Sequence, residues 1–252
     1  MIGDGGDGGA GRTNATQRDN LAPVASSLRL TLDLTALLLR KDLRILSRSR
    51  ETLALVLLFT VLCVLIFAFG FLREGGLGDD VVPGVLWVTL QFSGTIALLR
   101  LFAAEEEAGT LPMVLRTVAG TGPIFFSKAL LQLAFSTLVT ALLLPMVIVF
   151  FDVGRFDVGV VMVALALGLI GQAVVGTLVA ALMIRVRLRE VMLPLVLYPL
   201  LAPVLIAGVK VTALALSGGD RAIIGTWLSL MVVFDLVFVI ASPWLHARAV
   251  QA

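Results

Sequence analysis

The sequence predicts an all-α integral membrane protein with six transmembrane helices. Hydrophobic residues make up 59% of its 252 residues and charged residues only 14%, whereas an ordinary soluble domain is roughly 45–50% apolar. Six runs are long enough to cross a bilayer, which needs about 20 apolar residues per helix. Basic residues also gather at the ends of alternate runs, as they do in multi-spanning membrane proteins.

Two segments precede the first run. Residues 1–27 are rich in Gly, Asp, Asn and Ser, and we expect them to form a disordered cytoplasmic tail. The alternation of apolar and charged residues over 28–50 predicts an amphipathic interface helix beside an anionic leaflet. An ordinary solvated helix is the alternative. The apolar face comprises Leu32, Ala36, Leu39, Leu43 and Leu46. The charged residues of the opposite face and flank are Arg29, Asp33, Arg40, Lys41, Arg44, Arg48 and Arg50.

The remaining chain up to residue 252 is predicted to form one membrane domain with 28–50. The six predicted spans cover residues 53–72, 81–99, 129–151, 158–184, 191–209 and 222–245. The last contains Asp235, yet its thirteen Leu, Ile, Val or Phe residues, at about −0.3 to −0.6 kcal/mol each, outweigh one Asp at about +2.5 to +3.5 kcal/mol. We expect no cleavable signal peptide, because the first run is late and too long for one.

Basic residues near the span ends predict that both termini are cytoplasmic. Twelve of them lie on one side: five before the first span, three after the second, three after the fourth and one after the sixth. The other three loops hold one each, at Arg73, Arg155 and Arg221. Cytoplasmic loops are enriched in Lys and Arg, so the richer side is assigned to the cytoplasm.

The fourth span carries small residues at every fourth position, with one glutamine in register. Such a stripe predicts a face for close helix packing rather than a functional site. Its members are Ala164, Gly168, Gln172, Gly176 and Ala180.

The fifth span contains three prolines and should be kinked or broken, because each removes a backbone donor. They are Pro194, Pro199 and Pro203. Apolar residues continue beyond Lys210 to Leu216, which is too long for one span and too short for two. We therefore expect a re-entrant or interfacial segment over residues 205–221 on the outer side.

The loop of residues 100–128 is the most informative hydrophilic segment. Three carboxylates end the second span, a glycine breaks the helix, and a threonine can cap a short amphipathic helix. These residues are Glu105, Glu106, Glu107, Gly109 and Thr110. The new helix has an apolar stripe of Leu111, Val114, Leu115 and Val118, with Arg116 off the stripe. This pattern suits docking to a separate soluble protein; a simple solvated loop is the alternative.

Asp235 is the one carboxylate deep within a predicted span, and such a residue is a functional candidate by default. It could couple a proton or ion, or act structurally as an acceptor for hydroxyls or an arginine. Three further polar candidates lie within or beside the spans. They are Gln91, Gln172 and Lys210, and the lysine could equally snorkel to the outer interface.

The sequence lacks the signature motifs of several classes of enzyme and binding protein. There is no GxxxxGK[ST] phosphate loop, so ATP chemistry would belong to another chain. No His/Cys/Asp cluster has metal-ligand spacing, and the single histidine, His246, lies at the end of the last span. One cysteine, Cys63, excludes a disulfide framework, and scattered arginines argue against nucleic-acid binding. We expect a non-catalytic chain without a directly bound cofactor or metal.

Four segments carry a family resemblance: PGVLWVTLQFSGTIALLRLFAAEEEAGTL at 83–111, IFFSKALLQLAF at 124–135, VVGTLVAALMIRVRLREVMLPLVLYPLLAPVLIAGVK at 174–210 and FDLVFV at 234–239. Together they resemble the haem exporter protein B (CcmB) family, membrane subunits of an ABC transporter in cytochrome c maturation. The E-x-G-T-L portion is shared with many ABC-2 permeases. The Trp-containing second span and the R-E-V-x-L-P-L block are more specific.

The resemblance implies an ABC-2 (type V exporter-like) permease of the inner membrane, in a two-plus-two assembly with a CcmA-like ATPase subunit that would use the ATP. Haem would be handled by partner proteins: a CcmC-like membrane protein, a small CcmD-like subunit and a CcmE-like chaperone. ATP hydrolysis would release the haem-loaded chaperone. By the same analogy, residues 28–50 would be the interface helix and residues 105–118 would couple to the ATPase.

Two alternatives stay open. The same architecture serves ABC-2 exporters of lipids, polysaccharides or drugs. From a different class, the chain could be an ion- or proton-coupled carrier, with Asp235 as the coupling group, or an assembly scaffold. The inverted repeats of many carriers are not apparent in the sequence.

Overall fold

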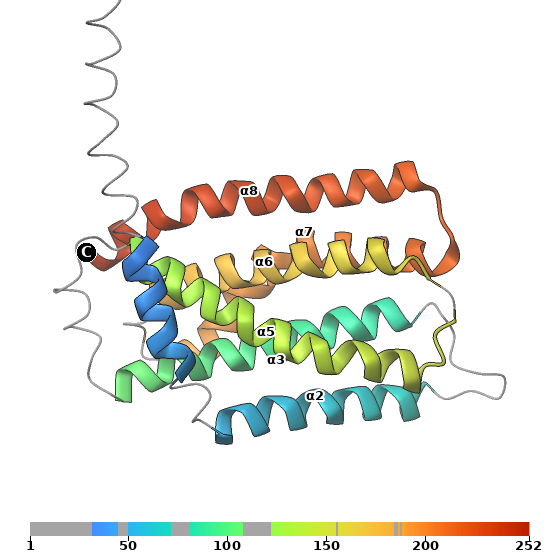
Figure 1. Ribbon diagram of the computed structural model, residues 1–252, viewed down its shortest axis with the longest axis horizontal. Coiled ribbons are helices and arrows are strands. Elements are labelled where there is room, and N and C mark those ends of the chain that lie inside the picture. The colour runs from blue at the N-terminus through green and yellow to red at the C-terminus, as the bar shows by residue number, and fades with distance from the viewer. Residues whose placement is uncertain are drawn as a thin grey trace, which may run out of the picture.

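The fold is a bundle of six long helices that run alternately up and down (Figure 1). The computed structural model describes residues 32–44, 50–71, 81–107, 122–154, 156–183, 186 and 188–251. The helices are α2 (Arg50–Gly70), α3 (Val82–Glu107), α5 (Gly122–Phe150), α6 (Val158–Leu182), α7 (Arg189–Ser217) and α8 (Arg221–Gln251). A shorter helix of residues 32–44 precedes them, and the described residues form no strand.

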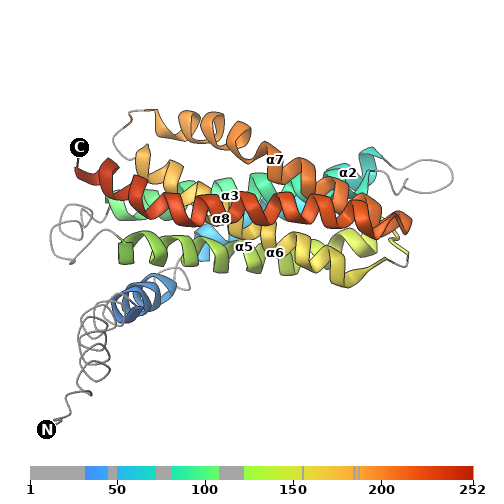
Figure 2. The ribbon, with the colours of Figure 1, turned by 90° about the horizontal axis from the view of Figure 1, so that it is seen from above.

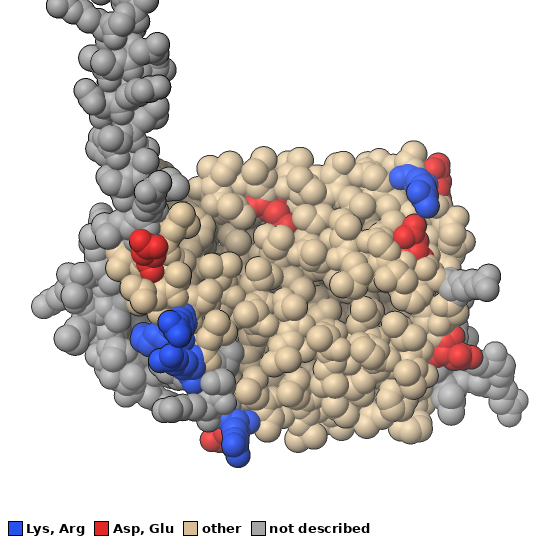
Figure 3. Space-filling view, viewed as in Figure 1, with Lys and Arg blue, Asp and Glu red and all other residues tan. Residues whose placement is uncertain are grey.

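All six long helices are long and apolar enough to cross a membrane. Charged side chains gather toward the two ends of the bundle, and the broad face between them shows a single acidic patch and is otherwise uncharged (Figure 3). Many large apolar side chains of the long helices are strongly exposed, including Phe69, Val149 and Ile240. In a bilayer such side chains face lipid, and each helix satisfies its own backbone groups. The structure therefore confirms the predicted helical membrane class.

The predicted loop of residues 100–128 is shorter than expected. Residues 100–107 continue α3, and residues 122–128 already belong to α5. The sequence reading ended each span at a charge, but Lys128 is buried within α5. A paired charge does not end a helix, because the helix needs only its own backbone bonds.

The prediction of a re-entrant segment over residues 205–221 is wrong for its helical part. Residues 205–217 continue α7, and the chain turns at Gly218, whose φ of +68° suits a residue without a side chain, before α8 begins at Arg221. The three prolines do not break α7, although the helix is bent (Figure 2). Its 29 residues span about 43 Å, so the extra length prolongs one span instead of starting another.

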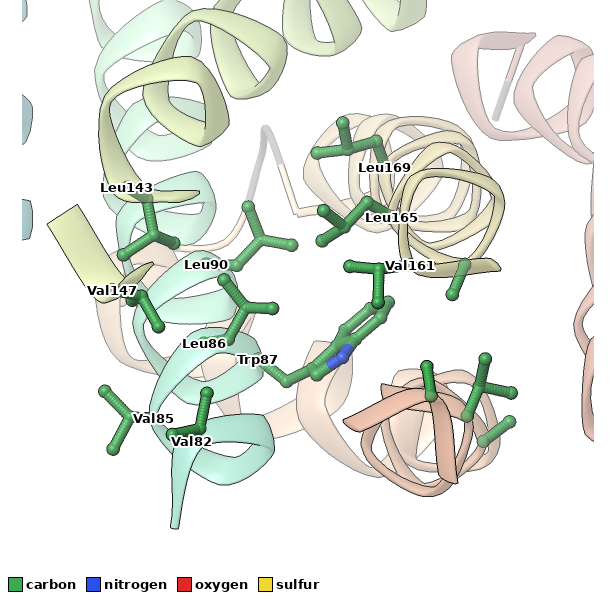
Figure 4. Close-up of a cluster of buried hydrophobic side chains, with 14 of the residues drawn as sticks. Val82, Val85, Leu86, Trp87, Leu90, Leu143, Val147, Val161, Leu165 and Leu169 are labelled. Atoms are coloured by element: carbon green, nitrogen blue, oxygen red, sulfur yellow. The ribbon is translucent and has the colours of Figure 1, made fainter. Parts of the chain in front are cut away.

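The side chain of Trp87 on α3 packs against both α6 and α7. Its side chain is 1% exposed, and its indole points from α3 toward Val161 and Leu165 of α6 (Figure 4). A Cβ on Gly168 of α6 or Gly208 of α7 would overlap the indole ring, so both glycines form its slot. This contact confirms the predicted packing face of the fourth span and gives its small residues a specific partner.

Polar side chains also join the helices within the bundle, mostly at α3. Thr60 of α2 and Ser93 of α3 form a hydrogen bond of 2.8 Å between their hydroxyls. The amide of Gln132 on α5 donates to the carbonyl of Gly94 at 2.9 Å. In their most apolar stretches, 72% of the residues of α3 are buried but only 17% of those of α8. Because its neighbours shield it from lipid, α3 can carry more polar residues than the other spans.

Candidate functional site

One end of the bundle collects the elements that could meet a soluble partner. The helix of residues 32–44 lies across this end, and α3, α6 and α8 finish there (Figures 1 and 2). The starts of α2, α5 and α7 lie at the same end. We call it the basic end, because the sequence assigns to this side twelve of the basic residues that lie near span ends.

A buried ion pair attaches the helix of residues 32–44 to the bundle. The ammonium of Lys128 on α5 lies 2.8 Å from a carboxylate oxygen of Asp42. The two residues are only 9% and 5% exposed, so their charges depend on each other rather than on water. The exposed Lys41 contacts the other Asp42 oxygen at 3.2 Å. Sequence patterns did not reveal this pair, because its members are 86 positions apart.

The predicted apolar stripe of the helix of residues 32–44 does not pack on the bundle as a whole. Leu39 packs against the cluster that contains Val56 of α2. Leu32 and Leu43, by contrast, are 60% and 39% exposed. The side that faces the protein instead centres on the buried Thr35 and Asp42.

Three of the predicted basic residues of this helix, Arg40, Lys41 and Arg44, are exposed near its C-terminal end. The exposed leucines and these exposed cations give one flank a composition that suits lipid headgroups or a soluble partner. Of the predicted interface set, Arg29, Leu46 and Arg48 lie outside the described residues.

The predicted coupling residues are only partly covered by the structure. Glu105, Glu106 and Glu107 form the last turn of α3 at the basic end, as expected for the end of the second span. Gly109, Thr110, Leu111, Val114, Leu115, Arg116 and Val118 lie outside the described residues. Their predicted amphipathic helix therefore stays a prediction.

The two predicted glutamines meet inside the bundle. The amide nitrogen of Gln172 on α6 donates to the backbone carbonyl of Gln91 on α3 at 3.3 Å. Both residues are buried, and a Cβ on Gly94 would overlap the Gln172 amide. The side chains of Gln172 and Gln132 thus both donate to backbone carbonyls of this stretch of α3. These two glutamines link helices in the described structure, since interhelical hydrogen bonds hold helices together where lipid provides no hydrophobic drive.

Asp235 is buried on α8 with 5% exposure, and neither of its carboxylate oxygens has a hydrogen-bond partner. The structural alternative, an acceptor for hydroxyls or an arginine, is therefore not realised in this conformation. Lys210 is exposed on α7 and does not approach Asp235 as an ion pair among the described residues. The described residues contain no group of three His, Cys, Asp or Glu side chains able to hold a metal.

Comparison with known proteins places this arrangement in a family. The model of the CcmB protein family matches residues 34–252. The chain belongs to the CcmB family. A curated relative, the heme exporter protein B of Paracoccus denitrificans, is 35% identical over 77 residues. That alignment covers 31% of this chain and 35% of the relative's length.

The family match includes nearly all of the helix of residues 32–44 as well as all six spans of this CcmB-family chain. The matched range therefore contains both the basic end and the intramembrane polar residues. Sequence reasoning found Asp235 and the glutamines from the rarity of polar residues in apolar runs. It missed Asp42, whose carboxylate lies in a run of other charges, and it counted Lys128 as an ordinary loop cation.

Proposed function

We propose that this CcmB-family chain is the membrane permease subunit of an ABC transporter for haem export in cytochrome c maturation. The observation that carries the proposal is the family match from residue 34 to residue 252, which covers the whole described bundle. The name of the curated relative, heme exporter protein B, supports the haem-export part of the proposal. The chain itself supplies the membrane bundle, and a separate CcmA-like subunit would supply ATP hydrolysis.

The basic end is the proposed docking face for that ATPase. It combines the exposed Arg40, Lys41 and Arg44 with the acidic last turn of α3. This end lies in the cytoplasm in the proposal, with both termini, and the protein resides in the inner membrane. Positive residues favour that side, and ATP is available there.

The buried pair of Asp42 and Lys128 is the proposed link between the docking face and the bundle. A displacement of the helix of residues 32–44 would be transmitted to α5 through this pair, because separating two buried opposite charges is costly. α5 packs against α2, α3 and α6. Movement at the docking face would thus spread across the bundle, while haem itself stays with CcmC-, CcmD- and CcmE-like partners.

Deletion of the gene tests the process. We expect the deletion strain to lose haem-stained c-type cytochromes and to regain them with the wild-type chain. Normal cytochrome c levels after deletion would contradict the proposed function. Loss of export of a lipid or polysaccharide, with normal cytochromes, would instead favour an ABC-2 exporter of another cargo.

Co-purification tests the docking face. Charge reversal of Arg40, Lys41 and Arg44 should reduce the amount of ATPase that co-purifies by at least tenfold. Charge reversal of Glu105, Glu106 and Glu107 combined with Leu115→Asp should do the same. The matched control reverses Asp157 and Arg221, an exposed pair at the opposite end of the bundle, and should leave the yield unchanged. Equal yields from all variants would place the docking face elsewhere.

A further inference from the structure

Three buried polar residues form a row on one side of α8. Asp235, Ser242 and His246 are 5%, 0% and 5% exposed. Positions separated by seven and four residues fall on the same helix face, so all three side chains point into the bundle. We call them the α8 polar row. Met231, on the same face and farther from the basic end, is fully buried and apolar.

The side chains of the row lack partners in the described conformation. Both carboxylate oxygens of Asp235, the hydroxyl oxygen of Ser242 and Nδ1 of His246 are buried without a hydrogen bond. Such atoms are unfavourable in a hydrocarbon environment, where no water replaces the missing bonds. Buried polar groups usually bind protein or ordered water. The row therefore needs hydrogen-bonding molecules that enter between the helices.

α6 forms the wall opposite the row. α6 and α8 run in the same direction, since both finish at the basic end (Figure 1). Asp157 contacts Arg221 across them at 3.5 Å. A Cβ on Gly171 would lie 2.7 Å from Oδ1 of Asp235. Both pairs differ by 64 in residue number, so the two helices keep one register along this length. Because Gly171 has no side chain, the carboxyl group of Asp235 lies close against the backbone of α6.

Among the described residues, no charged side chain pairs with the carboxyl group of Asp235. α6 has no titratable residue. On α7, Val204 lies near the same space, whereas Tyr198 interacts with Thr95 and Lys210 is exposed.

On α5, the one lysine, Lys128, is paired with Asp42. The remaining titratable residues of α8 besides the row are Arg221, which contacts Asp157, and Arg248, which stacks over Trp244. With no cationic side chain beside it in the described part of the chain, the carboxylate can be neutralised by a proton, because an ionised carboxylate without a partner is unfavourable in an apolar site.

We propose that the α8 polar row is a hydrated passage through which protons reach Asp235 from the basic end of the bundle. Seven residues separate Asp235 from Ser242 and four separate Ser242 from His246, or about 10 and 6 Å along the helix. These gaps are too long for direct hydrogen bonds, so water molecules bridge them. Phe238 and Val239, both partly buried, lie between Asp235 and Ser242 and must move aside for water to pass.

The proton balance is simple. The carboxylate of Asp235 accepts one proton from the water chain to become the neutral acid, and it returns that proton by the same route. His246 stands at the mouth, where its ring lies 5.5 Å from that of Phe125. This inference rests on the proposed function at one point: the proposed function places the basic end, where the passage opens, in the cytoplasm.

Cysteine accessibility tests the water. Methanethiosulfonate reagents in water react with thiolates, which form only where water reaches the sulfur. In a Cys63→Ala chain, Ser242→Cys should react at least tenfold faster than Met231→Cys, its matched control on the same buried face. Ile240→Cys, 70% exposed toward lipid, should also react slowly. A Ser242→Cys reaction as slow as that of Met231→Cys, in a variant that unfolds at the same temperature as the parent, would overturn the proposal.

A carbodiimide tests the proton. Dicyclohexylcarbodiimide is apolar and reacts with protonated carboxyl groups, and mass spectrometry can locate the product at Asp235, with Asp235→Asn as the blank. Labelling of the purified chain should fall severalfold as the buffer changes from mildly acidic to mildly alkaline. Labelling that ignores the buffer pH would show a sealed carboxyl and overturn the proposal. Neither test needs the ATPase or haem, so a failure here is distinct from failure of the proposed function.

Discussion

At the scale of single residues, partners distant in sequence decide what a side chain does. Lys128 is a loop cation by sequence and a buried counter-ion of Asp42 in the fold. Gly168 and Gly208 matter because the indole of Trp87 occupies the space where a Cβ would lie. Such sites tolerate little change, since packed interiors respond to a single methyl group.

Removal of one partner of the buried ion pair should be costly. Lys128→Met removes the buried partner of the Asp42 carboxylate and leaves only the exposed Lys41 beside it, and breaking a buried pair in this way costs up to about 3–5 kcal/mol. We expect faster proteolysis near residues 32–44 and a lower unfolding temperature in detergent. The double variant Asp42→Leu, Lys128→Met should recover most of the loss, and Lys41→Ala should change little. A single variant as stable as the wild type would show that the pair does not hold the helix.

The slot for Trp87 should reject a methyl group. Gly168→Ala or Gly208→Ala overpacks the indole and should destabilise the bundle by about 1–3 kcal/mol. Gly225→Ala, on a helix but with no atom near the new Cβ, should not destabilise it. Thermal unfolding followed by tryptophan fluorescence checks both. Equal unfolding temperatures for Gly168→Ala and Gly225→Ala would contradict the slot.

At the scale of helices, burial and polarity go together in this bundle. α3 is the most buried span, and it bonds to α2, α5 and α6 through polar groups. α2 is far less buried and meets only α3 and α5 extensively. Its attachment therefore depends on the cluster around Val56 and on the contact of Thr60 with Ser93.

The hydroxyl pair between α2 and α3 should contribute modestly. A double-mutant cycle with Thr60→Val and Ser93→Ala should give a coupling free energy of about 0.6 kcal/mol, and at most about 1.7 kcal/mol. Thr226→Val is the control, because that hydroxyl bonds only within its own helix, to the carbonyl of Ala222, and should show no coupling with Ser93→Ala. Zero coupling between Thr60 and Ser93 would mean that packing alone holds α2.

At the scale of the whole molecule, the ends of the bundle differ in charge. The basic end carries the helix of residues 32–44, and the opposite end has the turn from α7 to α8 at Gly218. In a membrane, such an asymmetry sets orientation, since basic loops stay in the cytoplasm.

The orientation can be measured with single cysteines in a Cys63→Ala chain. An impermeant maleimide should label Ser217→Cys on intact cells. It should label Lys41→Cys, which is also exposed, only after the membrane is opened. The reverse pattern would place the basic end outside and remove the docking face from the reach of a cytoplasmic ATPase.

The sequence alone determined the membrane class, the six spans, the packing stripe of α6 and the family resemblance. These features follow from local hydropathy and short motifs, which need no knowledge of neighbours. It also placed Glu105, Glu106 and Glu107 at the end of a helix, while the coupling helix of residues 110–118 stays a prediction. It failed at α7, where Lys210 suggested an end to a span that the fold carries on to Ser217.

Only the tertiary structure decided which side chains meet. The ion pair of Asp42 and Lys128, the slot of Trp87 and the unpartnered α8 polar row all depend on residues brought together from separate helices. In a bilayer an apolar helix surface is as stable against lipid as against another helix, so hydropathy does not predict which helices pack together. Shape and hydrogen bonding between helices make that choice, and they exist only once the bundle has formed.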